Sequence, residues 1–581
     1  MENHEEEVTF TKLFVPLTRK KAIVFTVILG AVVYLQIFFN GFVWDDVSYI
    51  IGNPEIEKFN LLTLFGPNMF NSSGYFRPIP AVYFSVLFQI FGKSAWGYHF
   101  LQWVMHIGCT VGLYELFRRF FKPGISLFLS WVFLVHPINV EAVAYIGASQ
   151  SQLYLLFGGA AVYLSLKKDL SARRIWAIHW WLLLAFLTKE VGVLFLGLVY
   201  FYRWLQGLKI PKLQWGLTGL TVGIYLALRM TVLSGVLQKM HLIPISEIPL
   251  TARLMHIPAV FFYYLKTWFF PQVLVIDQIW TISQITLTNF YLPLLADGIF
   301  LGLIVWGLNY FHRHDMPKFR LMAFFAGWYL ASVAMLMQVF PLDMTVADRW
   351  FYLPGVGMLG MLGVGLAEAG RRIKGLNKTA AAAAGGIVLI LLAARTMGRT
   401  ADWKDGLTLY GRDAGYYANY DLENYLGYEL AQAGKQAEAL PHFVRAAELL
   451  PHDTNLYNIG SIFEHLGDYP KALQYYGQAL ELNRGYMPHP EVRRLAYTGR
   501  LRLLLRTGTP EQTNPEMQKA VAEFPQEGTF WAFLAINEYA LKQQQPALAA
   551  AEKAKQFLPN AYTTKLYELI KNHREIDLSF D

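Results

Sequence analysis

The sequence predicts an all-α membrane protein: a polytopic transmembrane helix bundle followed by a solenoid of helical repeats. Of its 581 residues, 54% are hydrophobic and 16% are charged, whereas average soluble domains carry roughly 25% charged residues. The mean hydropathy is +0.30. Beyond about residue 400 the chain becomes polar and repeats itself at a helical spacing. These values exclude a disordered chain, a fibrous repeat and a purely soluble enzyme.

The first apolar stretch, 22–39, has no charge and is long enough to cross a bilayer. It lacks a small-residue cleavage site and further spans follow, so we expect an anchor rather than a signal peptide. The stretch 255–275 contains Lys266 and Pro271, and we expect it to be interfacial or re-entrant. The pattern predicts about eleven spans, near residues 22–39, 96–117, 124–141, 150–166, 175–188, 190–206, 213–231, 289–311, 320–340, 350–368 and 379–395.

Lysine and arginine clusters fall in every second segment between spans, which the positive-inside rule assigns to the cytoplasm. They are Arg19-Lys20-Lys21, Arg118-Arg119-Lys122, Lys167-Lys168-Arg173-Arg174, Arg203-Lys209-Lys212, Arg313-Lys318-Arg320 and Arg371-Arg372-Lys374-Lys378. An odd number of spans then predicts a cytoplasmic N-terminus and an extracytoplasmic C-terminal unit. The net charge of +8 therefore indicates basic loops beside anionic membrane lipid, not a nucleic-acid partner.

From about residue 422 the chain matches the helix–turn–helix tetratricopeptide (TPR) pattern. Gly427 and Gly460 are 33 residues apart, as are Ala439 and Ala472. Small residues let paired helices approach closely, and an aromatic residue fills the gap beside the next pair. The markers of a degraded third unit and a clearer fourth one are Gly508, Ala520, Pro525, Trp531, Leu534, Ala547, Ala554 and Pro559. We expect the concave surface to bind a protein or peptide acceptor; a bracing or dimerising role is the alternative.

These patterns divide the chain into a transmembrane domain at 1–398, a connector at 399–421 and a TPR domain at 422–581. The one cysteine, Cys109, excludes a disulfide framework and a cysteine-based metal site. The low cysteine count and the compact C-terminal part favour a bacterial inner membrane over an endoplasmic reticulum.

Two adjacent carboxylates, Asp45 and Asp46, follow the first span. A carboxylate pair at a span exit is costly near lipid and therefore indicates a functional site, although a solvated loop start is the alternative. Other loops on the predicted extracytoplasmic side add Arg77, His136, Glu141, Lys189, Glu190, Asp277, Asp348 and Arg349. Each alone has a structural explanation, such as a helix cap for His136, but their convergence from several loops indicates one site.

Transfer of a sugar from a lipid phosphate would use such a set. The negative charge that develops on the leaving phosphate needs Lys, Arg or a metal ion nearby, and the acceptor hydroxyl needs a carboxylate as general base. Direct displacement inverts the anomeric centre and requires one catalytic carboxylate. Asp45 or Asp46 would be that base, and the other would orient the acceptor or hold a divalent metal ion, the only cofactor this pattern suggests.

The remaining residues then take supporting roles. Lys189 and Arg349, followed by Arg77, are the predicted ligands of the donor phosphate. The residues expected to support the site are His136, Glu141, Glu190, Asp277 and Asp348.

The order of these motifs resembles the GT-C class of integral-membrane glycosyltransferases, specifically the transmembrane-and-TPR O-mannosyltransferase (TMTC) family and its bacterial relatives. The motifs are Asn40-Gly41-Phe42-Val43-Trp44-Asp45-Asp46, Arg77-Pro78, His136-Pro137, Glu141-Ala142-Val143-Ala144, Lys189-Glu190, Phe270-Pro271, Asp277, Asp348-Arg349 and Tyr352-Leu353-Pro354, followed by the TPR units. The resemblance implies a polyprenyl-phosphate monosaccharide donor, a lumenal or periplasmic active site and Ser/Thr of a protein as acceptor. It also implies that the first-loop acidic residue, here Asp45 or Asp46, is catalytic.

Two other functions fit the same architecture. One is a non-catalytic, membrane-anchored TPR receptor or assembly scaffold, and the other is a transporter of the lipid carrier. A transporter is expected to place polar residues near the bilayer midplane, whereas here they gather at one boundary.

Overall fold

The computed structural model describes residues 17–71, 75–233, 244–373, 377–417, 419–482 and 490–576. Every regular element in these ranges is helical, as predicted, and the isolated bridge found there joins Gln278 and Val346. The chain forms two compact units, Met1–Tyr417 and Ala418–Asp581. The predicted connector holds the end of α19 (Lys378–Asp402), all of α20 (Gly406–Tyr416) and the start of α21 (Tyr420–Gln432). Lys374, from the last predicted cytoplasmic cluster, lies outside the described residues.

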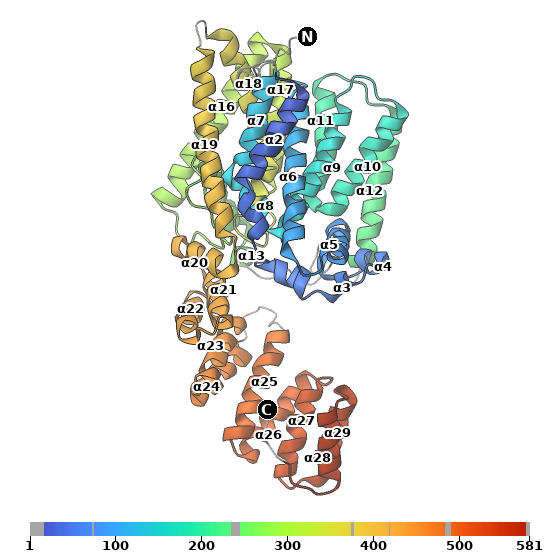
Figure 1. The fold of residues 1–581 in the computed structure, drawn as a ribbon, viewed down its shortest axis with the longest axis vertical. Coiled ribbons are helices and arrows are strands. Elements are labelled where there is room, and N and C mark those ends of the chain that lie inside the picture. The colour runs from blue at the N-terminus through green and yellow to red at the C-terminus, as the bar shows by residue number, and fades with distance from the viewer. Residues whose placement is uncertain are drawn as a thin grey trace, which may run out of the picture. The chain divides into compact units, whose positions relative to one another are not determined.

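Helices of the first unit occupy each stretch that the sequence predicted to span the membrane (Figure 1). They are α2 (Arg19–Val33) with η1 (Leu35–Phe39), α6 (Ala95–Phe117), α7 (Pro123–Val135) with η4 (Pro137–Asn139) and α8 (Val140–Ala144), α9 (Ser149–Ser165), α10 (Ala172–Thr188), η6 (Glu190–Val193) with α11 (Leu194–Leu205), α12 (Lys212–Leu233), α16 (Leu292–His314), α17 (Met316–Ala334), α18 (Pro354–Arg372) and α19 (Lys378–Asp402).

Shorter helices lie in the segments between them. They are η2 (Val47–Ile51), α3 (Pro54–Glu57), α4 (Leu61–Phe65), η3 (Met69–Asn71), α5 (Pro78–Phe91), η5 (Ile146–Ala148), α13 (Pro244–Glu247), α14 (Leu250–Leu254), α15 (Ile257–Phe269), η7 (Leu287–Tyr291), η8 (Asp348–Tyr352) and α20 (Gly406–Tyr416). The 13 residues of α15 extend about 20 Å at 1.5 Å per residue, less than the thickness of a bilayer core.

Two helical stretches in the described ranges are long and apolar enough to cross a membrane, Leu287–His314 and Thr379–Asp402. The bent pair Pro123–Val135 and Pro137–Ala144 adds a third if it forms one broken span. These helices support an integral membrane protein. The count of eleven spans, the orientation and the bacterial inner membrane stay predictions.

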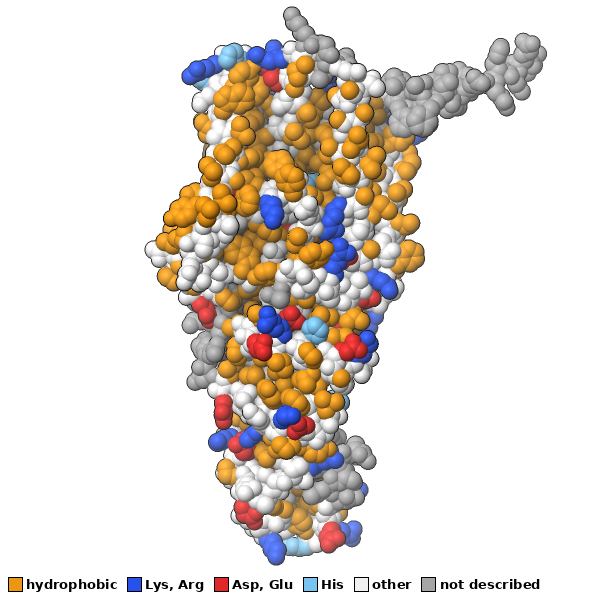
Figure 2. All heavy atoms as spheres, turned by 90° about the vertical axis from the view of Figure 1, so that its left-hand side faces the viewer, with side chains coloured by type: hydrophobic (Ala, Val, Ile, Leu, Met, Phe, Trp, Pro, Cys, Tyr) orange, Lys and Arg blue, Asp and Glu red, His pale blue; other side chains and the backbone are white. Residues whose placement is uncertain are grey.

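The outer faces of α16 and α19 carry apolar side chains. Figure 2 shows hydrophobic side chains gathered over the upper part of the face where these two helices lie. Strongly exposed examples, each between 57% and 68% exposed, are Leu295, Ile299, Leu303, Trp306, Ile390 and Leu391. A surface of this kind is stable against lipid rather than water.

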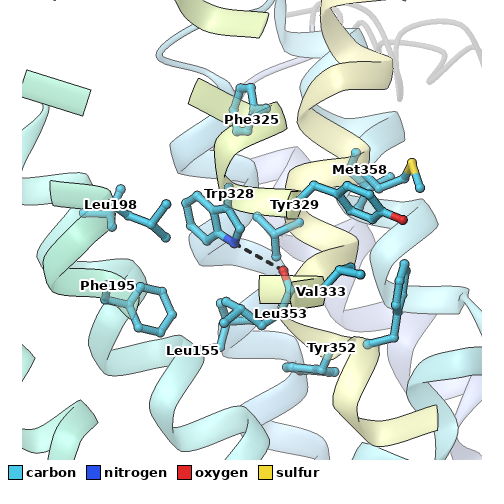
Figure 3. Close-up of a cluster of buried hydrophobic side chains, with 14 of the residues drawn as sticks. Leu155, Phe195, Leu198, Phe325, Trp328, Tyr329, Val333, Tyr352, Leu353 and Met358 are labelled. Carbon is cyan, nitrogen blue, oxygen red and sulfur yellow. Dashed lines mark hydrogen bonds between the residues drawn. The ribbon is translucent and has the colours of Figure 1, made fainter. Parts of the chain in front are cut away.

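Figure 3 shows the part of the first unit's core that lies between α9, α11, α17 and α18. Trp328 of α17 is 1% exposed, and its indole N–H donates to the carbonyl of Leu353 at 3.2 Å. Phe195 of α11 meets the Trp328 ring edge-on, with centroids 5.9 Å apart. This hydrogen bond joins α17 to the turn before α18.

Close approach of α17 and α18 depends on glycine. A Cβ built on Gly357 would lie 2.6 Å from the backbone nitrogen of Tyr329 and 2.8 Å from the carbonyl oxygen of Phe325. We expect Gly357→Ala to lower the free energy of unfolding by about 1–3 kcal/mol, because the two helix backbones must separate. Thermal unfolding in detergent measures this change. The matched control is Gly365→Ala on the same helix, since a Cβ there meets nothing within 4 Å; equal losses in both variants would contradict the packing argument.

The second unit is built from helix pairs, as the repeat predicted. Its helices are α21 (Tyr420–Gln432), α22 (Gln436–Leu449), α23 (Asp453–His465), α24 (Tyr469–Glu481), α25 (Pro490–Thr507), α26 (Pro510–Glu523), α27 (Gly528–Ala540), α28 (Gln544–Phe557) and α29 (Ala561–Lys571). Cβ atoms built on Gly460 and Gly499 would each lie 2.7 Å from the ring of Tyr476. The aromatic ring thus fills the space between its own helix pair and the next, which is the expected TPR packing.

Candidate functional site

The two adjacent aspartates have different environments. Asp46 is fully buried, and its carboxylate accepts backbone N–H bonds from Gly147 at 2.7 Å and from Val43 at 3.3 Å. Burial raises the pKa of Asp46 well above its usual value, although these N–H groups oppose the shift. Asp46 therefore joins the 43–46 turn to η5, and its carboxyl group is closed to substrate.

Asp45 is half-buried and points to a different partner. Its Oδ2 accepts a hydrogen bond from the hydroxyl of Tyr145 at 2.9 Å. The residue before it, Trp44, has φ of +56°, a left-handed conformation that is uncommon for a bulky residue. Such strain persists only where the surrounding structure enforces it and is typical of functional sites. The turn at Trp44 thus directs two neighbouring carboxylates to different places.

Arg349 lies against the same aromatic residues. Its guanidinium carbon is 5.1 Å from the ring centroid of Trp44 and 5.8 Å from that of Tyr145. Its backbone N–H donates to Glu141 Oε2 at 2.9 Å, and its guanidinium forms a salt bridge with the same carboxylate. Burial by itself lowers the pKa of Arg349, but the Glu141 carboxylate raises it above the usual value. This pair fixes η8 to α8 and keeps a permanent positive charge beside Asp45.

Two further cations, Arg77 and Lys189, come from the segments before α5 and η6. Arg77 donates to Glu190 at 3.0 Å, and its guanidinium carbon lies 4.0 Å from the ring centroid of Tyr75. Lys189 is half-buried and forms no salt bridge within the described part of the chain. Burial, together with the positive charges of Arg77 and Arg349, lowers the pKa of Lys189 to about 7. Lys189 is thus the cation of the three that has no paired carboxylate among the described residues.

One more carboxylate, Asp343, joins this group from the segment before η8. Asp343 is exposed, and its negative charge raises the pKa of Lys189, of Tyr49 and of Tyr75. The negative charge of Asp45 also raises the pKa of Tyr49. The charges of Asp45, Asp343 and the three cations therefore share one neighbourhood.

The remaining predicted residues have mainly structural contacts. His136 lies flat on Trp268, with ring centroids 4.1 Å apart, and its Nδ1 accepts the N–H of Ile138 at 3.2 Å. It therefore caps η4, the structural alternative considered for it. Asp348 is buried and accepts the hydroxyl of Tyr263 at 2.5 Å.

Asp277 belongs to another part of the unit. Its side chain is buried, and its negative charge raises the pKa of Tyr417. The residues beside it are held by Asp413, which accepts the N–H of Ile276, and by Thr345, whose N–H donates to the carbonyl of Gln278. The structure thus brings together Asp45, Arg77, Glu141, Lys189, Glu190 and Arg349.

A polar stripe on α6 supports the site and was missed in the sequence. Gln102 donates to the carbonyl of Tyr145 at 2.9 Å, and His99 Nε2 lies 3.3 Å from the carbonyl of Gly41. His106 lies 2.8 Å from the hydroxyl of Tyr352. These side chains and Thr110 are fully buried. Their spacing of three to four residues inside an apolar span was the available signal, because it puts them on one helix face.

The aspartate pair does not fit the divalent metal ion that the sequence suggested. Both Asp46 oxygens accept backbone N–H groups inside the protein, so Asp45 is the member of the pair that faces the cations. Within the described residues no three His, Cys, Asp or Glu side chains are grouped as metal ligands.

A tetratricopeptide-repeat family model matches residues 456–486. Along most of the chain the sequence is similar to proteins named protein O-mannosyl-transferases. It is 25% identical to mouse TMTC3 over 77% of this chain, and 25% identical to human TMTC3 over 80%. A Caenorhabditis elegans protein O-mannosyl-transferase is 23% identical over 73%. The matches cover 53%, 55% and 62% of those proteins, so the chain spans little more than half the length of the relatives.

Two solved structures show weaker similarity. A MamA fragment from Desulfovibrio magneticus covers 26% of this chain and 84% of its own, with 18% identity and a TM-score of 0.23. ArnT from Cupriavidus metallidurans, bound to undecaprenyl phosphate, covers 79% of this chain and 81% of its own, with 16% identity and a TM-score of 0.38. At these TM-scores neither structure decides the fold. The sequence matches, together with the TPR match, confirm the resemblance carried by the motifs: over most of its length the chain is similar to the TMTC protein O-mannosyl-transferases.

Proposed function

We propose that this protein is a GT-C glycosyltransferase that moves a monosaccharide from a polyprenyl-phosphate donor to a Ser/Thr hydroxyl of an extracytoplasmic protein. The observation that carries the proposal is the position of Asp45, the half-buried member of the aspartate pair, beside the cations Arg77, Lys189 and Arg349. The relatives named protein O-mannosyl-transferases support the reaction class and a protein acceptor. The TPR unit is the proposed binding surface for that acceptor.

Asp45 is the proposed general base. Its carboxylate takes the proton of the acceptor hydroxyl as the oxygen attacks the anomeric carbon. The bond from that carbon to the lipid phosphate breaks in the same displacement, so the configuration inverts and the phosphate leaves with its electron pair. A phosphate leaving group needs no proton from a general acid.

The three cations are the proposed ligands of the leaving phosphate. Arg77 and Arg349 are already paired with Glu190 and Glu141, which fixes their guanidinium groups. Lys189 is the cation whose charge is least compensated, so its ammonium group is best placed to bind the phosphate. Fixed charges in a partly dehydrated site stabilise developing negative charge without reorganising.

Purified protein in lipid nanodiscs tests this function directly. Polyprenyl-phosphate mannose and a Ser/Thr-rich peptide should give a glycopeptide detectable by mass spectrometry, with the opposite anomeric configuration by NMR. Other polyprenyl-phosphate sugars serve to identify the preferred donor, and nucleotide sugars should give no product. Folded protein that transfers none of the lipid-linked sugars would contradict the proposal, and retained configuration would remove the single-displacement mechanism.

The low pKa of Lys189 predicts a pH-dependent donor KM. The donor is a phosphodiester with one negative charge at neutral pH, so the ammonium group must be protonated to attract it. Lys189 is charged below about pH 7 and neutral above it. We therefore expect the donor KM to rise above pH 7, by roughly 10- to 100-fold at the limit, the value of a charge-assisted hydrogen bond.

Variants separate this effect from a general pH effect. Lys189→Arg keeps its positive charge at all working pH values, so its donor KM should no longer change with pH. Lys189→Met should show the high donor KM even below pH 7. The matched control is Lys266→Met, at an exposed lysine on α15, which should leave the profile unchanged. A wild-type donor KM that is constant from pH 6 to 9 would contradict this role for Lys189.

A further inference from the structure

The end of α19 and the segment just after it contact the loop that carries Asp45 at two positions. The side-chain amide of Asn40 donates to the carbonyl of Thr400 at 3.0 Å. The backbone N–H of Gly41 donates to the carbonyl of Lys404 at 2.8 Å. These hydrogen bonds join the start of the Asp45 loop to residues more than 350 positions later in the chain.

Trp403 lies between these two contact points in the sequence and is fully buried. Its ring stacks with that of Tyr145, with centroids 6.0 Å apart and planes inclined by 22°. The same tyrosine donates its hydroxyl to Asp45 at 2.9 Å and meets the ring of Trp44 at a centroid distance of 5.1 Å. Trp403 therefore reaches the proposed base through one intervening side chain.

The segment that bears Trp403 is itself held firmly. Arg399 donates to both carboxylate oxygens of Asp413, at 2.6 and 2.8 Å, and both side chains are almost fully buried. Arg412 donates to Asp402 at 2.6 Å. Bidentate pairs of this kind combine strong hydrogen bonds with a defined geometry. They fix the end of α19 to α20, so the backbone that carries the Trp403 side chain is held in place.

We propose that Trp403 is a positioning residue for Asp45: by stacking on Tyr145 it holds the hydroxyl that orients the carboxylate. The role follows from the proposed function, in which Asp45 accepts the acceptor proton. Trp403 does not itself touch the reacting groups in this scheme. Displacing a catalytic group by about 1 Å costs up to 100-fold in rate, so removal of the stacked ring acts on kcat rather than on substrate binding.

The test compares four variants in the nanodisc assay, with rates expressed per folded molecule. Trp403→Leu removes the flat ring and is expected to lower kcat about tenfold with both KM values within about twofold of wild type. Trp403→Phe keeps an aromatic face and should retain at least about a third of wild-type kcat. Tyr145→Phe should lose about tenfold, and the double variant W403L/Y145F no more than Tyr145→Phe alone, because both act on one interaction.

The matched control is Trp328→Leu. Trp328 is equally buried, and its N–H is bonded to Leu353 in the core. It should lose stability as Trp403→Leu does, yet keep kcat within about threefold. Multiplicative losses in the double variant, or equal kcat losses in both tryptophan variants, would overturn the positioning role.

Labelling of Asp45 by a water-soluble carbodiimide gives a readout that needs no transfer activity. Release of Asp45 from the Tyr145 hydroxyl should change its labelling rate at least about twofold in Trp403→Leu, whereas Trp328→Leu should match wild type. Wild-type protein that transfers no sugar would end the proposed function, and the labelling would still decide whether Trp403 positions Asp45. An unchanged labelling rate in Trp403→Leu would overturn the inference.

Discussion

Asp45→Asn is expected to lower kcat by roughly 10³-fold, in the middle of the 10²–10⁴ range that a positioned general base contributes. The amide cannot take the acceptor proton, but its oxygen can still accept the hydroxyl of Tyr145, which donates at 2.9 Å in the wild type. The protein should therefore fold normally and bind donor with little change in KM. Single-turnover transfer from polyprenyl-phosphate mannose to peptide measures the chemical step directly.

Asp46→Asn is the matched control, one residue away. The buried carboxylate accepts two backbone N–H groups, from Gly147 and Val43. An amide has one acceptor oxygen, so one N–H loses its partner at a cost of about 1–3 kcal/mol. We expect lower thermal stability and a smaller loss of kcat per folded molecule than in Asp45→Asn. A wild-type rate in Asp45→Asn, or the larger kcat loss in Asp46→Asn with unchanged stability, would reverse the assignment.

The sequence alone could not distinguish these two aspartates. Both were predicted as site residues, because a carboxylate pair directly after an apolar span is costly near lipid. Their separation arises from the left-handed backbone at Trp44 and from the approach of Gly147, 101 residues after Asp46. Neither a long-range contact nor an enforced strained turn leaves a local pattern that can be read from one sequence.

In the rest of the chain, too, local features could be predicted from the sequence and long-range contacts could not. Helices were predictable where apolar runs are long, as for α16 and α19, and the repeat spacing predicted the packing of Tyr476 against Gly460. Lys189 and Glu190 were expected at the site, but the sequence did not indicate a partner for Glu190, which binds Arg77, 113 residues earlier. The partner of a side chain depends on how the loops fold back across the bundle. Residue type therefore predicted which residues lie at the site better than it predicted which side chains they bind.

Glu141→Gln is expected to be the most destabilising single change at the site. The Glu141 carboxylate and the Arg349 guanidinium are 4% and 8% exposed, and the carboxylate also accepts the backbone N–H of Arg349 at 2.9 Å. Removing one partner of a buried pair leaves an unpaired charge, at a cost of about 3–5 kcal/mol. Thermal unfolding in detergent should show this loss, and transfer activity should fall because η8 is no longer held against α8.

Glu190→Gln provides the comparison, because it breaks an ion pair of similar chemistry in a wetter place. The Arg77 and Glu190 side chains are 16% and 28% exposed, so water can solvate the arginine left behind. The expected cost is at most about 1 kcal/mol, as for pairs near the surface. If both variants lost the same stability, burial would not be what makes the Glu141–Arg349 pair important. If Glu141→Gln were as stable as wild type, the buried Glu141–Arg349 pair would not be what holds η8 against α8.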